Sequence, residues 1–377
     1  MQLFIKTSLS FLFAFLGLKA AEPTAPIPHT PQFRIEETIV SYRGKLVNDY
    51  VSFPALTRTS EDEIVLSYKR GYAHARDPGA VLEIIHFDLK TGKRIQEPLR
   101  IGMADRVMQM GEWIRFPNGT LGTFIDSHWI NEDNEHVRIG LRYALSEDNG
   151  STFGPLKEMG IVDGVEYGYL FDTVTIGQRL YALNMTFEYL VGGRRTVDAM
   201  YTDDNGESWH FIRNLSEEFG NIPINESGFI AYNDGFIFIT RGYDSMARLH
   251  RVDKEFNLIH ETNLTEITPT IASYIGRPRI FTIEDKYFLI GRNRRSTEPG
   301  TRMELGLMRI DPESLTVEKQ FVLDNIEQGA VTDGYYPFPI LVDSGDRRLL
   351  NVFDYRAILR NSPDIIRLQF DSSEFLE

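Results

Sequence analysis

The amino-acid sequence of 377 residues predicts an all-β protein folded as a six-bladed β-propeller. Short stretches of alternating apolar and polar residues recur along the chain, and no helical period extends over about 12 residues. A pair of apolar strands joined by a tight turn recurs six times, and one eight-residue turn pattern occurs twice. Six sheets of about four strands close naturally into a propeller, which leaves a β-sandwich as the alternative.

The duplicated turn pattern is S/T-x-D-x-G-x-S/T-W/F, found at Ser146–Phe153 and again 56 residues later at Thr202–Trp209. In this spacing the Asp side chain accepts hydrogen bonds from nearby backbone N–H groups, and Asn-Gly supplies the positive φ of a hairpin turn. The last aromatic residue is placed to enter the core. Two such matches at the spacing of neighbouring blades indicate repeated sheets.

The six strand pairs set the positions of the blades. They are Phe53–Tyr68, Trp113–Ile125, Phe171–Met185, Gly228–Thr240, Arg279–Gly291 and Phe338–Phe353. Weaker versions of the turn pattern follow the first and fifth pairs, at Phe87–Gly92 and Arg309–Ser314. We expect Ile35–Tyr42 to close the ring by pairing with Ile365–Phe370, because propellers commonly complete their last sheet with a strand from the other terminus.

The first 34 residues are expected to lie outside the propeller. Residues 1–21 contain Lys6, an apolar run at Leu9–Leu18 and small residues after it, which is typical of a secretory signal peptide. The run is too short for a stable membrane span. Residues 22–34 are rich in proline and are expected to form a spacer, so that 35–377 is one propeller domain of a secreted or periplasmic protein.

Composition excludes several classes of function. The formal net charge of −14 argues against a nucleic-acid partner, because phosphate binding requires a basic surface. There is no cysteine, so neither disulfide bonds nor a lipid-modified cysteine are possible. No spacing of potential ligands indicates a metal site, and we expect no cofactor and a monomer.

With its paired turns and six strand pairs, the chain resembles the sialidase superfamily, whose six-bladed propellers carry such turns as Asp boxes. The resemblance covers nearly all of residues 35–372. It implies an enzyme that acts on a glycan or oligosaccharide.

The resemblance implies three catalytic residues. Asp77, in the stretch that also holds Arg70 and His74, lies where sialidases have their general acid. Glu226 takes the position of the carboxylate that assists the nucleophile. The nucleophile itself is a tyrosine at the start of the sixth blade, and Tyr336 is favoured there over Tyr335.

The resemblance also implies arginines that hold the carboxylate of the substrate. Arg241 follows Glu226 by one hairpin, and Arg302 lies at the fifth-blade position. The first-blade arginine of sialidases is replaced by Ser52, so that a uronic acid or another sugar end is as suitable as sialic acid. Arg70 is one residue that can compensate for the missing charge.

Two other functions remain open. His74 and His128 fit a polysaccharide lyase, in which a His and a Tyr act as base and acid on a uronate and an Arg stabilises the charge. In that case a histidine is essential and Glu226 is dispensable, whereas a hydrolase requires the reverse. The third possibility is a propeller that binds glycans without catalysis.

Overall fold

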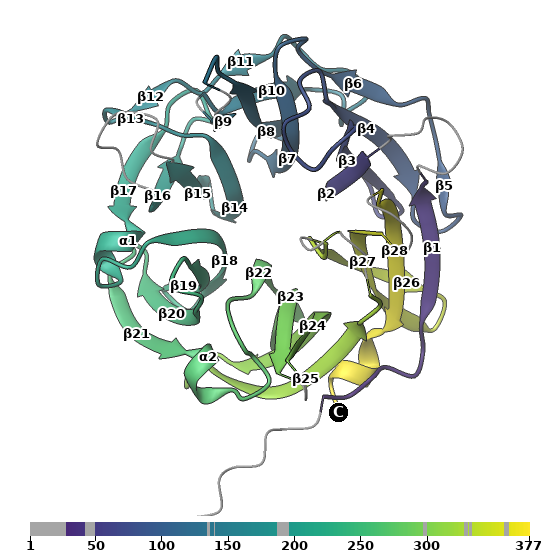
Figure 1. Ribbon diagram of the computed structural model, residues 1–377, viewed down its shortest axis with the longest axis vertical. Coiled ribbons are helices and arrows are strands. Elements are labelled where there is room, and N and C mark those ends of the chain that lie inside the picture. Colours follow the sequence, from purple (N-terminus) through teal and green to yellow (C-terminus); the bar gives the residue numbers. More distant parts are fainter. Residues whose placement is uncertain are drawn as a thin grey trace, which may run out of the picture.

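The computed structural model describes residues 28–41, 50–133, 136–138, 140–186, 196–296, 300–327, 331, 334–357 and 362–377, apart from the side chain of His136. The predicted signal peptide and the first part of the predicted spacer therefore lie outside the described residues. Six antiparallel sheets are arranged around a central axis as the blades of a propeller (Figure 1). Within the ranges given, no helix is long and apolar enough to cross a membrane.

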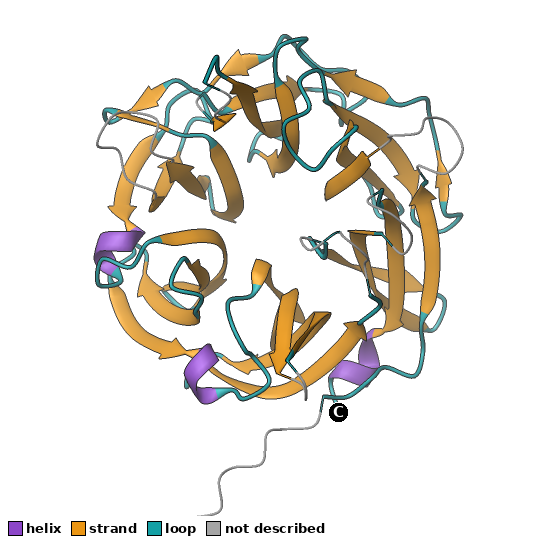
Figure 2. Ribbon diagram, in the orientation of Figure 1, coloured by secondary structure: helices purple, strands orange, loops and turns teal. Residues whose placement is uncertain are grey.

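Each blade has four main strands, listed from the axis outward, and almost all regular structure is β (Figure 2). Blade 1 contains β2 (Tyr50–Arg58), β3 (Glu63–Gly71), β4 (Val81–Asp88) and β5 (Lys93–Arg94), with β6 (Leu99–Ile101) also on β4. Blade 2 contains β7 (Val107–Arg115), β8 (Leu121–Ile130), β10 (Arg142–Ser146) and β11 (Lys157–Glu158), with β9 (His136–Val137) on β8. Blade 3 contains β14 (Tyr169–Ile176), β15 (Arg179–Thr186), β16 (Thr196–Thr202) and β17 (His210–Asn214).

The second half of the ring repeats this order. Blade 4 contains β18 (Ile224–Tyr232), β19 (Gly235–Gly242), β20 (Ala247–Asp253) and β21 (Leu258–Asn263). Blade 5 contains β22 (Gly276–Ile283), β23 (Lys286–Ser296), β24 (Thr301–Asp311) and β25 (Thr316–Asp324). Blade 6 contains β26 (Phe338–Ser344), β27 (Arg347–Arg356), β28 (Asp364–Asp371) and β1 (Ile35–Val40). A two-stranded hairpin, β12 (Ile161–Val162) with β13 (Val165–Glu166), and the short helices α1 (Leu215–Glu218), α2 (Leu264–Ile267) and η1 (Ser372–Phe375) complete the described elements.

The first strand of the chain closes the ring, as the sequence predicts. β1 pairs with β28 in antiparallel register from Ile35 opposite Gln369 to Val40 opposite Ile365. Ion pairs reinforce the seam: Arg356 lies 2.8 Å from Asp324 of the neighbouring blade and also contacts Glu36 of β1.

The last residues of the predicted spacer 22–34 contact the propeller. His29 forms a parallel bridge with Phe321, and its backbone N–H donates to the Gln320 carbonyl over 2.8 Å. The carboxylate of Glu374 accepts hydrogen bonds from the backbone N–H groups of Gln32 and Phe33. Proline content alone could not reveal these contacts, since the partners come from the far end of the chain.

Between the blades lie apolar clusters that hold neighbouring sheets together. One cluster joins blades 2 and 3 around Phe116, Phe124 and Trp209, the aromatic residue that ends the second duplicated turn. Another joins blades 5 and 6 through Leu305, Leu307 and other buried side chains. Burial between sheets therefore supplies the cohesion that cysteines cannot provide in this chain.

A carboxylate stabilises the turn after the third strand in every blade. Asp148 accepts from the backbone N–H of Thr152 over 2.8 Å, and Asp204 accepts from that of Ser208 over 2.9 Å. The equivalent turns in the other four blades use Asp88, Asp253, Asp311 and Asp371. The sequence patterns identified four of these six turns and missed the two at Asp253 and Asp371.

The inner strands of blades 1 to 5 bend toward the axis through bulges. The pairing register shifts within β2, β7, β14, β18 and β22, each time in the first half of the strand. Phe53 and Arg277, each followed by proline, have φ values of 56° and 43° inside these bulges. Bulges redirect side chains and are common next to active sites.

We expect Asp148→Ala and Asp204→Ala each to lower the melting temperature by about 2 °C, because each removes the acceptor of several turn hydrogen bonds. These hydrogen bonds also lower the pKa of both carboxyls to about 2. Their contribution to stability is therefore present above about pH 4 and is lost as the pH falls toward 2. Thermal melts between these pH values measure both effects. Asp234→Ala, in a fully exposed position, is the control, and an equal loss in this variant would contradict the role of the turns.

Candidate active site

The candidate active site lies at the axis, where the inner strands begin. In an antiparallel blade this end is opposite the turns that contain Asp148 and Asp204, since those follow the third strands. The inner strands of the blades surround the axis (Figure 1). Side chains from β7, β14, β18, β22 and the segment before β26 are connected here in one network. Five of the six blades therefore contribute to a single cluster.

Tyr336 and Glu226 are in direct contact, although 110 residues separate them. The Tyr336 hydroxyl donates a hydrogen bond to Oε1 of Glu226, and both residues are buried. The other oxygen, Oε2, accepts from Nη1 of Arg241 at 2.5 Å and from the backbone N–H of Arg277 at 2.8 Å. Glu226 lies within the bulge of β18, and Arg277 lies within that of β22.

Glu226 is ionised throughout the physiological pH range. Burial on its own would raise its pKa, but Arg241, Arg292 and the Tyr336 hydrogen bond outweigh burial and lower the pKa to about 2. A carboxylate with so low a pKa is a good hydrogen-bond acceptor and, while both arginines face it, a weak base.

Two arginines form the cationic side of the cluster. Arg241 stacks over the ring of Tyr274 at 4.1 Å and keeps a partly exposed side chain. Arg292 is buried, donates to the carbonyl of Gly334 over 2.9 Å and lies 5.5 Å from the centre of the Tyr336 ring. A Cβ atom at Gly276 would lie 2.6 Å from this guanidinium, so a larger residue there would require Arg292 to shift.

A second group of charged side chains lies next to the cluster. Both oxygens of Glu112 accept from Nη2 of Arg279, at 2.8 and 2.9 Å, and Arg277 also contacts Glu112. Arg279 stacks on Phe338 and lies 3.8 Å from Asp172. Burial raises the pKa of Asp172 to about 6, against the opposing effect of Arg279.

Asp354 lies behind Tyr336 and fixes its backbone. Its Oδ1 accepts from the N–H groups of Tyr336 and Tyr355, both over 2.7 Å, while Oδ2 is buried with no hydrogen-bond partner among the described residues. Burial raises the pKa of Asp354 to about 8. The neighbouring Tyr335, with φ of 63°, points the other way and donates to Asp324 inside the core.

Among the sequence-predicted residues, Glu226, Arg241 and Tyr336 are brought together. Asp77 is not part of this contact: it is fully buried in an ion pair with Lys69, with Oδ1 2.8 Å from Nζ. Burial lowers the pKa of Lys69 to about 8 even though Asp77 opposes that shift. The general-acid role of Asp77 stays a prediction.

The remaining predicted residues lie at different distances from the cluster. Arg302 is exposed at the start of β24 and donates to the Asn325 carbonyl, and Arg70 pairs with Glu83 in blade 1. His74 is closer, since its ring packs on Phe53, which in turn packs on Tyr336. His128 is buried and lies 3.9 Å from Asp126 in blade 2.

The structure adds residues that the sequence did not identify. Four of them lie in the axial cluster or contact its members: Glu112, Asp172, Arg292 and Asp354. Glu112 and Asp172 lie in the inner strands of their blades, as Glu226 does, but at different positions in those strands, so the repeat did not mark them. Arg292 and Asp354 lie late in second strands, where no motif points to the axis. In the described part of the chain, no group of three or more potential ligands could hold a metal ion.

No protein-family model and no curated protein sequence matches this chain. Its fold is similar to that of a protein of unknown function from Dyadobacter fermentans, with a TM-score of 0.65 and 14% identity over 89% of this chain and 99% of that one. Trypanosoma rangeli sialidase, solved in complex with sialic acid, has a TM-score of 0.60 and 11% identity over 93% of this chain. This chain spans 61% of that sialidase.

A third similar structure is an α-L-arabinofuranosidase from Fusarium graminearum, solved with an iminosugar inhibitor. It has a TM-score of 0.57 and 10% identity over 89% of this chain and 100% of that one. At these identities the likeness shows the fold, which is a sialidase-like six-bladed propeller. The neighbours with named activities are glycoside hydrolases.

We expect Asp354→Asn to flatten the pH dependence of stability. An acid whose pKa is raised by folding binds more protons in the folded than in the unfolded state between its ordinary pKa of 3.8 and about 8. The free energy of unfolding therefore falls as the pH rises through this range, by an amount on the order of a few kcal/mol. Asparagine cannot ionise, so the variant does not show this decrease in the free energy of unfolding.

Denaturant unfolding at about pH 5 and pH 9 measures the difference. Asp343→Asn, an exposed position in the same blade, is the matched control and should keep the pH dependence of the unchanged protein. Parallel profiles for Asp354→Asn and the unchanged protein would show that Asp354 does not hold its proton in the folded state.

Proposed function

We propose that this protein is a sialidase-like glycoside hydrolase that releases a terminal acidic sugar from a glycan outside the cytoplasm. The observation that carries the proposal is the hydrogen bond from the Tyr336 hydroxyl to the ionised Glu226, with Arg241 and Arg292 beside it. The proposal is independent of sequence similarity, since the named enzymes share only the fold with this chain.

In the proposed reaction, the Tyr336 oxygen bonds to the anomeric carbon and gives its proton to Glu226, while the bond from that carbon to the leaving oxygen breaks. Tyrosine has an ordinary pKa near 10 and needs such a base. A neutral nucleophile avoids repulsion where the anomeric carbon bears a carboxylate, and sialidases with a tyrosine nucleophile are a known exception to the two-carboxylate mechanism. Water then cleaves the sugar from Tyr336.

Arg241 and Arg292 would hold the anionic group of the substrate, in place of the predicted pair Arg241 and Arg302. Guanidinium groups bind carboxylates through paired, charge-assisted hydrogen bonds. Binding would also change Glu226: an anion that shares the charge of Arg241 weakens the effect that keeps the pKa of Glu226 low. Substrate would therefore make Glu226 a stronger base when the base is needed.

The proposal keeps Asp77 as the acid that protonates the leaving oxygen, on one structural condition. The ion pair with Lys69 must open, because a fully buried carboxylate cannot reach a substrate. His74 and the exposed Tyr72 lie on the same connection between β3 and β4, so movement of this connection would uncover Asp77.

One observation favours the lyase alternative. The Tyr50 hydroxyl lies 3.1 Å from Nδ1 of His74, which is the His and Tyr combination that such a mechanism uses. Phe53 lies between this pair and Tyr336, because its ring contacts both His74 and Tyr336.

We expect Tyr336→Phe to lower kcat by about 10³-fold and Glu226→Gln by about 10²-fold or more. The measurement is turnover of sialosides, glucuronides and arabinofuranosides with analysis of the products. Tyr335→Phe is the matched control: it removes the hydrogen bonds to Asp324 and to the Ile326 carbonyl, costs about 1 kcal/mol of stability and leaves kcat unchanged. Full activity in Tyr336→Phe would exclude this nucleophile, and an unsaturated uronate product lost in His74→Ala would establish the lyase.

The two roles of Asp77 can be separated by a double substitution. Asp77→Ala alone should destabilise the protein by about 3–5 kcal/mol, because it leaves Lys69 buried without its partner. Asp77→Ala with Lys69→Met should recover most of that stability. If Asp77 is the acid, the folded double variant loses about 10²-fold or more in rate on alkyl glycosides and little on aryl glycosides whose leaving group needs no proton. Equal rates of the double variant and the unchanged protein on alkyl glycosides would leave Asp77 with a structural role only.

A further inference from the structure

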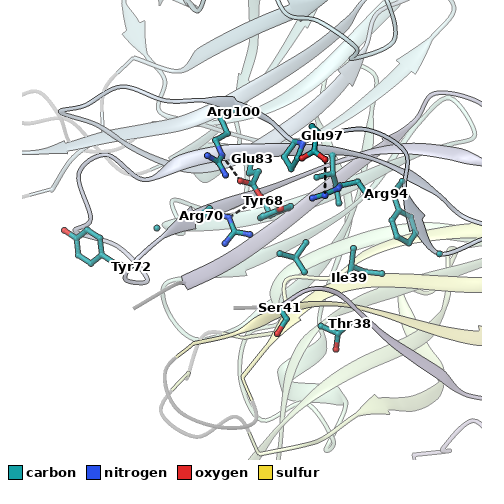
Figure 3. Close-up of a pocket in the computed structure, with 16 residues that line it drawn as sticks. Thr38, Ile39, Ser41, Tyr68, Arg70, Tyr72, Glu83, Arg94, Glu97 and Arg100 are labelled. Carbon is teal, nitrogen blue, oxygen red and sulfur yellow. Dashed lines mark hydrogen bonds and ion pairs between the residues drawn. The ribbon is translucent and has the colours of Figure 1, made fainter. Parts of the chain in front are cut away.

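A deep groove lies away from the axis, between the outer strand of blade 6 and the face of blade 1 (Figure 3). Its volume is about 880 Å³. β1 forms one wall through Thr38–Ser41, and β3 and β4 form the other. A ligand of several sugar rings is within the size range of such cavities.

The blade 1 side of the groove carries a connected set of charges. Glu83 is buried and accepts from Nε of Arg70 at 3.1 Å and from Nε of Arg100 at 2.8 Å, and the Tyr68 hydroxyl donates to it as well. These partners lower the pKa of Glu83 even though burial opposes them. Glu83 is therefore held as an anion and fixes the arginines around the opening.

Two arginines have donors to offer a ligand. Arg100 uses only Nε on Glu83, and its Nη groups form no hydrogen bond with the described residues; its side chain is 63% exposed. Arg94 is 47% exposed and has a distant, exposed ion-pair partner in Glu97, at 3.7 Å. The groove thus has three arginines and two glutamates on a protein whose net charge is −14.

Apolar side chains lie between these charges. Ile39 of β1 and Ile85 and Phe87 of β4 line the groove together with Tyr68. A sugar ring has an apolar C–H face and a polar rim, and sites for small ligands combine apolar surface with a few placed polar groups. The excess of arginine calls for an anionic ligand, because guanidinium forms paired hydrogen bonds with carboxylate or sulfate groups.

The groove and the axial cluster share one connection. Gly71 and Tyr72 line the groove, and His74 of the same connection packs on Phe53 beside Tyr336. A glycan whose end reaches Tyr336 can therefore extend toward the groove across blade 1.

From these observations we propose that the groove between β1 and blade 1 binds an anionic oligosaccharide at a site separate from the axial cluster, with Arg94 and Arg100 as the main contacts. This second site rests on the proposed function for the identity of the ligand as a glycan. It retains an acidic polymer while its end is processed at the axis.

Calorimetric titration of the full chain carrying Tyr336→Phe tests binding without turnover. The probe is a heparin-derived hexasaccharide, which bears uronate and sulfate groups; maltohexaose and sodium sulfate are the neutral and free-anion comparisons. We expect Arg94→Ala with Arg100→Ala to weaken hexasaccharide binding by about 10-fold or more. Both side chains are exposed, so the fold should be retained, and thermal melts check this.

The matched control is Arg347→Ala with Arg348→Ala, which removes the same charge at an exposed turn of blade 6 and should change binding by less than about twofold. If both double variants lost hexasaccharide affinity equally, the effect would come from the overall charge of the protein, and the proposed site would be wrong. Sulfate or maltohexaose binding as tightly as the hexasaccharide would overturn the anionic glycan as ligand, as would absence of hexasaccharide binding. Because binding is measured without catalysis, failure of the proposed hydrolase leaves this result intact, and the reverse also holds.

Discussion

Pairing of β1 with β28 is the interaction on which the rest of the structure depends. It joins the two ends of the described chain and turns six consecutive sheets into a closed ring. Tyr336 and Glu226 belong to blades that are not neighbours, so their contact requires blades 4 to 6 to be placed around the axis within the few tenths of an ångström that a hydrogen bond tolerates. Arg356 forms ion pairs with Asp324 of blade 5 and with Glu36 of β1, which connect the last blade to its neighbour and to the closing strand.

The charge buried at the axis does not serve stability. Removing ions from water usually costs more than their attraction returns, and apolar side chains of similar size would pack at lower cost. Glu112, Asp172 and Glu226 are nevertheless held there by arginines from blades 4 and 5. In the proposed reaction, side chains fixed in this way would need little reorganisation when charge develops on a substrate, which is a large electrostatic contribution to catalysis in enzymes generally. The apolar contacts between blades supply stability, and part of it offsets the cost of burying these charged side chains.

The fold could be predicted because its signals are local. A strand pair and a turn are encoded within about 20 residues, so the six pairs, their order and the closing strand follow from the sequence. Glu226, Arg241 and Tyr336 were identifiable because they lie in strand starts or ends that the repeat fixes. Arg292 was not, because its guanidinium lies beside Gly276 of another strand, a contact that no local pattern encodes. The Asp77 and Lys69 pair was also hidden, since nothing in the spacing distinguishes a buried ion pair from an exposed loop.

The six carboxylate turns and the axial cluster lie at opposite ends of the blades, and this separation has an evolutionary consequence. Each turn is completed within a few residues, so selection can preserve it one blade at a time. The other end can accept substitutions without disturbing those turns. The fold is similar to that of the Dyadobacter fermentans protein, with a TM-score of 0.65, although only 14% of the residues are identical. The residues around the axis can therefore change while the turns that hold each blade together stay the same.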